Sequence, residues 1–230
     1  MSALANKQPV GWRAKIGVIV PPSNTVNEAE FNQKAPDGVT FHFARSPLHA
    51  NPAEDNFRTM LADIKAAMKD LSACKVNFAT YACTAGSMAC PPDRLLGAIS
   101  GCANVPANSA AQAIISALDV LDARNIVMAS PYTNETNAHE ADYLRRHGIK
   151  VLASAGLNLN TSLEKIQTIS RVSPLEVFNH AKSVNRKYAE AVLICCTDLN
   201  TFDVIEPLEA ELRNPVISSS SATLWLSLRG

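Results

Sequence analysis

Short apolar runs alternate with longer amphipathic stretches from one end of the chain to the other. The runs that we predict as strands cover residues 16–20, 40–44, 76–81, 125–129, 150–155, 191–195 and 215–218. A helix is predicted over residues 54–71, where apolar side chains recur every three or four positions and form one face. A second helix is predicted after Asn108, with an apolar stripe at Ala111, Ile114, Ile115, Leu118 and Leu121. This alternation is typical of βα units around a parallel sheet.

Two of the predicted strands end in the same dipeptide. Residues 78–84 read Phe-Ala-Thr-Tyr-Ala-Cys-Thr and residues 192–197 read Val-Leu-Ile-Cys-Cys-Thr, so Cys83 and Cys196 each fall at a strand end. In open parallel sheets, ligands bind outside the carboxyl ends of the strands. A helix that begins directly after each cysteine would present free N–H groups, which lower the pKa of a thiol and attract carboxylates. We expect chemistry at both cysteines, whereas Cys195 points to the other side of its strand and is expected in the core.

Polar residues also follow two other predicted strands. Two prolines stop the first strand, and Ser23 and Asn24 leave a hydroxyl and an amide at its mouth. The arrangement recurs after Ala129, where Tyr132 lies in the segment 130–134. The Asn24 side chain can cap the following helix or bind a ligand, and Tyr132 can be a packed aromatic or a ligand group. Both ends are candidate contributors to one site.

Composition narrows the class of protein. The 230 residues are 47% hydrophobic, which is enough for one large domain or two small lobes with a core. The formal net charge of +0 gives no electrostatic footprint for nucleic acid or an anionic membrane. The start of the sequence has no apolar signal region, and no stretch approaches the ~20 apolar residues of a membrane span, so we expect a cytoplasmic protein. Its expected partners are a small molecule and another copy of itself.

The six cysteines favour free thiols over disulfides or a metal centre. They occur without a secretion signal, mostly in apolar segments, which is typical of buried thiols in a reducing compartment. They are scattered and lack the paired spacing of a zinc site. The sequence also lacks the glycine pattern of a dinucleotide or phosphate loop and the motif of a serine nucleophile. We therefore expect no metal and no cofactor.

Four segments carry a resemblance to a known family. They are Val-Pro-Pro-Ser-Asn-Thr at 20–25 followed by Glu28, Ala-Cys-Thr-Ala-Gly-Ser at 82–87, Ser-Pro-Tyr at 130–132, and Cys-Thr-Asp-Leu-Asn-Thr-Phe-Asp-Val-Ile-Glu at 196–206. Together they resemble the aspartate/glutamate racemase superfamily, and within it the branch that holds maleate cis-trans isomerases and arylmalonate decarboxylases. The resemblance runs through nearly the whole chain.

The resemblance implies an α/β fold with two similar Rossmann-like lobes, parallel sheets and an active site in the cleft between the lobes. The first lobe would cover residues 1–105, completed by 214–230, whose strand and helix would return to pack on it; the second would cover 106–213. The implied activity is a cofactor-independent cis-trans isomerisation of a small carboxylate or dicarboxylate that uses two cysteines. A homo-oligomer, dimer or higher, is the family-level expectation.

Residue roles carry over from the same resemblance. Cys83 would be the nucleophile and Cys196 the acid/base partner. Substrate carboxylates would be bound by Asn24, Tyr132 and an asparagine of the loop that holds Asn158 and Asn160. The remaining expected substrate-binding residues are Ser23, Thr84, Ala85, Thr197 and Asp198.

Three other functions stay open from the sequence. Asp198 would repel a dicarboxylate, but it could receive a substrate ammonium, which keeps racemisation of an amino acid by two-cysteine proton transfer as an alternative. Decarboxylation is disfavoured because the related arylmalonate enzymes use a single cysteine on the side of the second lobe, and this chain has Cys83 as well. A small-molecule-binding module with inert cysteines is the alternative outside enzymes.

Overall fold

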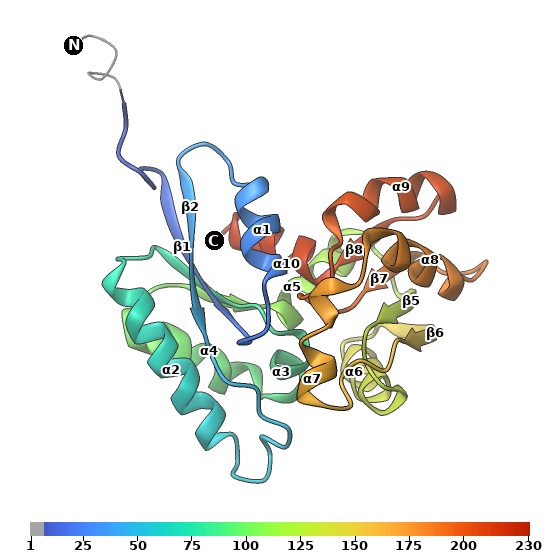
Figure 1. Cartoon of the computed structure of the whole chain (residues 1–230), viewed down its shortest axis with the longest axis horizontal. Helices are drawn as coiled ribbons and strands as arrows, with labels where there is room; N and C mark the ends of the chain where they lie inside the picture. Colours follow the sequence, from blue (N-terminus) through green and yellow to red (C-terminus); the bar gives the residue numbers. More distant parts are fainter. Residues whose placement is uncertain (1–6) are drawn as a thin grey trace.

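Residues 7–230 are described by the computed structural model, and they form two four-stranded sheets that lie side by side (Figure 1). The strand order is β2-β1-β3-β4 in the first sheet and β6-β5-β7-β8 in the second. Every paired strand is parallel to its neighbour. The halves therefore repeat one topology, in which β1 is equivalent to β5, β2 to β6 and β3 to β7. The predicted α/β class with two similar parallel lobes is confirmed.

The elements of the first half are, in chain order, β1 (Ala14–Val20), α1 (Val26–Gln33), β2 (Val39–Arg45), α2 (Arg58–Ala73), β3 (Phe78–Tyr81), α3 (Thr84–Ala89), α4 (Pro92–Ala103), β4 (Ala107–Ser109) and α5 (Ala110–Val120). Those of the second half are β5 (Asn125–Ser130), α6 (Asn134–Arg146), β6 (Lys150–Gly156), α7 (Leu163–Ile166), the 3-10 turn η1 (Ile169–Arg171), α8 (Pro174–Val184), β7 (Ala191–Ile194), α9 (Phe202–Leu212), β8 (Val216–Ser218) and α10 (Ser219–Ser227). Among residues 7–230, no helix is both long and apolar enough to cross a membrane.

Helices cover both sides of each sheet, so both faces of the central strands are buried. All residues of β3 and β7 are buried, as expected for strands inside a parallel sheet. Seven predicted strands correspond to observed ones, but β4 was not predicted. Its sequence, Ala-Asn-Ser, has no β-branched or aromatic residue, and it becomes a strand by pairing with β3.

Two predicted helices are shorter than their apolar patterns. The helix predicted over 54–71 begins at Arg58, because Asn56 and Phe57 have left-handed backbone with φ of 56° and 62°. The carboxylate of Asp55 accepts a hydrogen bond from the Thr59 amide at 2.9 Å, which holds this first turn. In α5, the predicted stripe residue Leu121 lies past the helix end and is 41% exposed.

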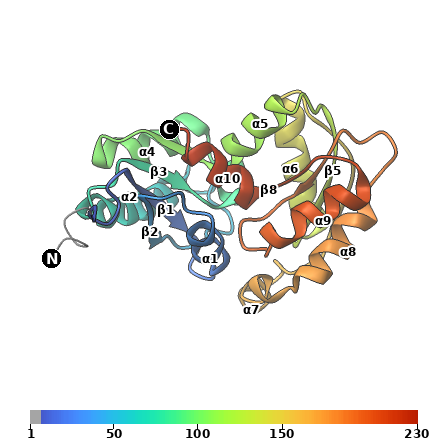
Figure 2. The same ribbon diagram turned by 90° about the horizontal axis from the view of Figure 1, so that it is seen from above.

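The last helix of each half packs away from its own sheet. In α5, Ile114 and Leu118 lie in one core cluster with Ile126 and Leu193 of the second sheet. In α10, Leu224 lies in a cluster with strand residues of the first sheet. Figure 2 shows α5 over the second sheet and α10 between the two sheets. This exchange of helices ties the lobes together and keeps the carboxyl ends of the two sheets in a fixed relation.

The pairing of two strands corrects the predicted lobe boundaries. Residues 107–109, predicted in the second lobe, form β4 of the first sheet. The terminal segment was predicted to return to the first lobe as a strand and a helix, but only the helix does so. Its strand, β8, pairs with β7, and Val216 is buried in the core of the second sheet.

Candidate active site

The two cysteines lie at equivalent ends of β3 and β7. Cys83 and Cys196 are each two residues beyond the last strand residue, and they are 6% and 5% exposed. The segments that carry the two cysteines are in contact, since the Thr197 hydroxyl donates a hydrogen bond to the carbonyl of Ala82 at 2.9 Å. Cys83 is near enough for its charge to raise the pKa of Cys196. The structure thus brings together the two thiols that the sequence analysis selected.

The thiol of Cys83 has neighbours that favour its ionisation. Burial raises its pKa, while interactions with the Gly86 N–H and the Tyr81 hydroxyl lower it. Cys83 precedes α3 directly, as predicted. A Cβ at Gly86 would lie 2.7 Å from the Tyr81 hydroxyl and 3.1 Å from the Cys83 sulfur. Only glycine leaves room for this group of atoms.

Gly86→Ala is therefore expected to slow the alkylation of Cys83 by iodoacetamide about tenfold near neutral pH, equivalent to a rise of roughly one pKa unit. The added methyl group displaces the Tyr81 hydroxyl from the thiol and removes a donor that stabilises the thiolate. Peptide mapping by mass spectrometry would measure the rate at Cys83 alone. Gly97→Ala in α4 is the control, because no atom lies within 4 Å of its Cβ position. Equal rates in the two variants would contradict the role of Gly86.

Cys196 is a thiol that keeps its proton. Burial raises its pKa first, and the charge of Asp198 raises it further. The Tyr132 hydroxyl and the Asp198 N–H, which lies 3.3 Å from the sulfur, act against this rise. The helix predicted directly after Cys196 is absent from this position, since α9 begins only at Phe202. A protonated thiol facing a more easily ionised one suits proton donation by Cys196 and nucleophilic attack by Cys83.

Two residues after Cys83 extend the site across the lobes. The Thr84 hydroxyl is buried and has no hydrogen-bond partner among the described residues. Ala85 packs against the core cluster of the second sheet, which includes Tyr132 and Cys196. A buried hydroxyl without a partner is costly, and a bound polar ligand would satisfy it. Thr84, Ala85 and Tyr132 therefore lie where the prediction placed them, around the two thiols.

Asn24 and Thr197 hold the lobes together. The Asn24 side chain is fully buried, and its Nδ2 donates to the carbonyl and hydroxyl oxygens of Thr197 at 3.2 and 3.3 Å. Its Oδ1 accepts from the Asn27 N–H at 3.1 Å, which satisfies one amide at the start of α1. Of the two roles left open for Asn24, the structure shows the capping one, together with an inter-lobe contact.

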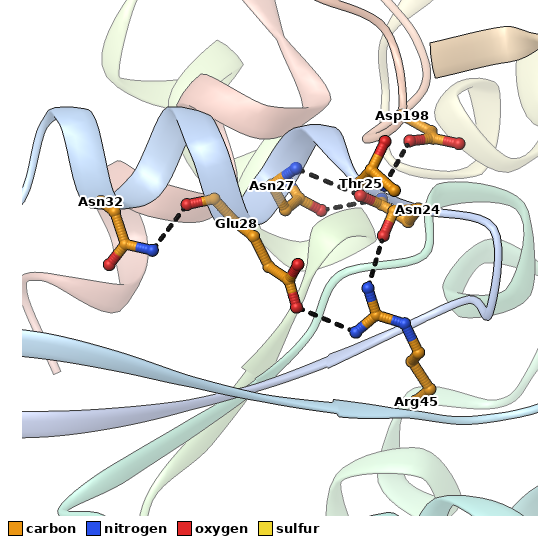
Figure 3. Close-up of polar contacts among 7 residues, drawn as sticks. All are labelled: Asn24, Thr25, Asn27, Glu28, Asn32, Arg45 and Asp198. Atoms are coloured by element: carbon orange, nitrogen blue, oxygen red, sulfur yellow. Dashed lines mark hydrogen bonds and ion pairs between the residues drawn. The ribbon is translucent and has the colours of Figure 1, made fainter.

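Asp198 also reaches across to the first lobe. Its Oδ1 accepts a hydrogen bond from the Thr25 N–H at 3.1 Å, at the start of α1 (Figure 3). Burial raises the pKa of Asp198 to about 7, against the lowering effects of the Thr25 and Val26 amides and of Arg45. Arg45 is itself bound to Glu28 at 2.9 Å. Asp198 is thus buried at a helix N-terminus and does not point to solvent.

The other expected ligand residues lie around the same loops in different roles. Asn160 accepts from the Thr133 N–H at 2.7 Å and donates to the Thr136 hydroxyl at 2.8 Å, so its amide caps α6. Asn158 is exposed, with a left-handed φ of 59° that asparagine tolerates well. Ser23 is half-buried in the turn between β1 and α1.

Three buried polar residues of the site region were missed by sequence reasoning: Tyr81, Glu30 and Glu140. Glu30, on α1, accepts hydrogen bonds from the N–H groups of Thr201 and Phe202 at 2.6 and 2.9 Å, where α9 begins. Asp198 and Glu30 therefore make reciprocal caps, each binding the first turn of a helix in the other lobe. The only sequence signal was a shared Asn-x-x-Glu after the first strand of each half, at 27–30 and 137–140. Among residues 7–230, no three His, Cys, Asp or Glu side chains are grouped to hold a metal ion.

Comparison with known proteins finds a matching family model and several similar proteins. A family model described as arylmalonate decarboxylase matches residues 16–230. The maleate isomerase of Geobacillus stearothermophilus is 26% identical, and the alignment covers 94% of this chain and 90% of the relative. The maleate isomerase of Pseudomonas putida KT2440 is also 26% identical, with the same coverage.

Solved structures share the fold. The maleate isomerase of Pseudomonas putida S16, in a cysteine-to-alanine mutant with maleate, superposes with a TM-score of 0.81 at 24% identity, covering 94% of this chain and 90% of that one. The maleate cis-trans isomerase of Nocardia farcinica, in a cysteine-to-serine mutant with a covalently bound succinylcysteine intermediate, has a TM-score of 0.81 at 21% identity, with 94% and 91% covered.

Proposed function

The chain belongs to the arylmalonate decarboxylase family, and from that premise we propose that it is a cofactor-independent cis-trans isomerase of maleate or a closely similar dicarboxylate. The observation that carries the proposal is the pair of buried thiols at equivalent strand ends: each has two donors that act against the rise in its pKa, and after burial the charge of Asp198 is the main cause that raises the pKa of Cys196, whereas it is a minor one for Cys83. The covalent succinylcysteine of the Nocardia farcinica relative supports a mechanism through a cysteine adduct.

The first step is addition of a thiolate to the alkene. The Cys83 sulfur attacks one alkene carbon, and the electron pair of the double bond moves toward the neighbouring carbon and its carboxylate. Cys196, still protonated, delivers a proton to that second carbon. The product is a succinyl thioether on Cys83, in which the former double bond is a single bond that can rotate.

The second step reverses the first after rotation. Cys196, now a thiolate, removes the proton that lies opposite the carbon–sulfur bond, the double bond re-forms in the trans geometry, and the Cys83 thiolate leaves. Atoms and charges balance, so no oxidant or cofactor is consumed. The Thr84 hydroxyl, buried without a partner, and the Tyr132 hydroxyl beside Cys196 are the proposed donors to the substrate carboxylates.

The test is direct conversion of substrate without any added cofactor. Proton NMR in D₂O of the enzyme with maleate should show loss of the maleate signal and growth of the trans product. Aspartate, glutamate and an arylmalonate would be tested in parallel, because α-deuteration would indicate a racemase and loss of carbon dioxide a decarboxylase. Turnover of one of those compounds with none of maleate would overturn the proposal.

Racemisation of an amino acid has less support, because the carboxylate that could receive an ammonium is already bound. Asp198 accepts from the Thr25 N–H at the start of α1. Its charge does, however, raise the pKa of both thiols. Above pH 7, where Asp198 is ionised, its negative charge therefore disfavours the reaction of a dicarboxylate.

Asp198→Asn is expected to raise kcat/KM for maleate about three- to tenfold above pH 7, since it removes one negative charge near a dianion and keeps the acceptor oxygen for Thr25. The pKa of Asp198 is raised to about 7, so the wild-type side chain is already neutral well below that pH. The gain should appear as the pH rises through 7 and vanish near pH 5.5. A pH series of kcat/KM in both proteins would measure it, and a gain independent of pH would refute the electrostatic cause. Weaker binding of an amino acid would instead favour the racemase.

A further inference from the structure

The two halves carry a buried glutamate at the same place. Pro21 follows β1 and Pro131 follows β5, and the helix after each holds the sequence Asn-x-x-Glu, ending at Glu30 in α1 and Glu140 in α6. Counted from the end of the preceding strand, the two glutamates have identical positions. Both side chains are buried, at 6% and 0% exposure.

Their hydrogen-bond partners differ, and so does the effect of those partners on the pKa of each side chain. Burial raises the pKa of Glu30, and its Oε2 has no partner among the described residues, but its Oε1 accepts from backbone N–H groups at the start of α9, which stabilise the carboxylate and act against that rise. Glu140 has no such donors. Its Oε2 accepts from the Cys195 thiol at 3.0 Å, and its Oε1 has no partner among the described residues. A thiol is a weak donor, so burial dominates and raises the pKa of Glu140 to about 8. At neutral pH this side chain is a carboxylic acid.

Glu140 lies within electrostatic reach of the reacting groups. Its charge raises the pKa values of Cys83, Tyr132 and Cys195, which come from the start of α3, the loop before α6 and the end of β7. On α6 itself the titratable neighbours are His139, which is exposed, and Tyr143. The strand β6 packs along α6 and contributes only Lys150, at its exposed first position. The helix α3, which begins directly after Cys83, contacts α6.

We propose that Glu140 is a positioning residue that works as a neutral acid: it anchors Cys195 directly behind Cys196, and it shuts the site down when it ionises at alkaline pH. This inference rests on the proposed two-cysteine function. An ionised Glu140 would place an uncompensated charge behind the thiols, raise the pKa of Cys83, and repel the carboxylates of the substrate. The equivalent Glu30 is the contrasting case, because N–H groups at the start of α9 act against the rise in its pKa that burial causes, and Glu140 has no backbone donors of this kind.

The first test is the pH profile of kcat/KM for maleate between pH 6 and 10. Wild-type activity should decline above pH 8. Glu140→Gln mimics the neutral acid, keeps an acceptor oxygen for Cys195 and cannot ionise, so its profile should lack the decline and exceed wild type about tenfold at pH 9.5. Glu30→Gln is the matched control, which should lower activity at every pH and keep the alkaline decline. An unchanged decline in Glu140→Gln would overturn the proposal.

A second variant, Cys195→Ala, tests the role of Glu140 by removing the thiol that is hydrogen-bonded to it. The Cys195 thiol lowers the pKa of Glu140, so Cys195→Ala should raise that pKa and move the alkaline decline to higher pH. A structural defect alone would lower activity without moving the midpoint. A midpoint that stays in place or moves to lower pH would contradict the pairing of Glu140 with Cys195.

Two measurements need no substrate, and they separate failure of this inference from failure of the proposed function. Difference infrared spectra of wild type against Glu140→Gln should show a protonated carboxyl band at pH 6.5 that is lost at pH 9.5. Iodoacetamide labelling of Cys83 should be about tenfold faster in Glu140→Gln than in wild type at pH 9.5 and equal at pH 6.5. If maleate is not a substrate but both results hold, Glu140 retains its role. If maleate is turned over and both fail, only the role of Glu140 is lost.

Discussion

Cys83→Ser is expected to lower kcat for maleate by more than about 10³-fold, because a serine hydroxyl in this position cannot ionise near neutral pH. The Gly86 N–H and the Tyr81 hydroxyl lower the pKa of a thiol that burial has raised, and the same two donors are far too weak to produce an alkoxide. The geometry of the site should survive, since oxygen is close in size to sulfur. Initial rates of trans-product formation by NMR would measure the effect.

Cys90→Ser provides the matched control for this variant. Cys90 is a buried thiol at the other end of α3, in the core cluster of the first lobe. Its replacement should cost stability and leave kcat within about threefold of wild type, since small changes in core chemistry act mainly on folding. Full activity of Cys83→Ser would refute the two-cysteine mechanism. Equal loss in both variants would indicate a general packing defect.

The strands and the two cysteines could be predicted because their signals are local. A run such as Ala-Val-Leu-Ile in β7 is apolar at every position, and the Cys-Thr pairs follow such runs directly. The three-residue β4 gave no local signal, since its partner β3 makes it a strand. The packing of α5 on the second sheet and of α10 on the first follows the predicted lobes, whereas the pairing of β8 with β7 in the second sheet was not predicted.

The polar part of the site was harder to predict because its side chains choose among distant partners. Asn24 was expected at a substrate carboxylate, yet it binds Thr197, which is far along the chain. Asp198 was expected at the substrate, and its carboxylate binds the Thr25 N–H at the start of α1. Asn160 was expected at the substrate as well, and it caps α6. Each of these residues offers an amide or carboxylate oxygen, and a backbone N–H at a helix start competes for it as strongly as a ligand does.

The internal duplication was the strongest unused signal. The Cys-Thr repeat was recognised at the ends of β3 and β7, but the second repeat, Asn-x-x-Glu, was not. A repeat that places a glutamate inside two helices is hard to interpret from sequence, because Glu is a good helix former and is usually exposed. Only burial identifies Glu30 and Glu140 as structural or functional residues.

Cys196→Ser should stop turnover after the first bond has formed. In the proposed mechanism Cys83 attacks the alkene, and Cys196 donates a proton to complete the adduct and removes one to release the trans product. A serine hydroxyl relays protons poorly, so overall kcat should fall about 10²–10⁴-fold, as is usual on loss of a general acid or base. Because Cys83 is intact, addition can still proceed slowly, and the enzyme should accumulate a thioether on Cys83.

Intact-mass spectrometry after incubation with maleate would detect this adduct as one added substrate mass, and peptide mapping would place it on Cys83. The double variant Cys83→Ser with Cys196→Ser is the control, and it should show no added mass. The Tyr132 hydroxyl lies beside Cys196 and could relay a proton in its place, so Tyr132→Phe in the Cys196→Ser background should slow both adduct formation and residual turnover. Racemisation predicts no adduct in any of these proteins, because proton transfer between two thiols forms no carbon–sulfur bond. An adduct that maps to another cysteine, or a Cys196→Ser enzyme with normal turnover, would assign the chemistry to a different pair of groups.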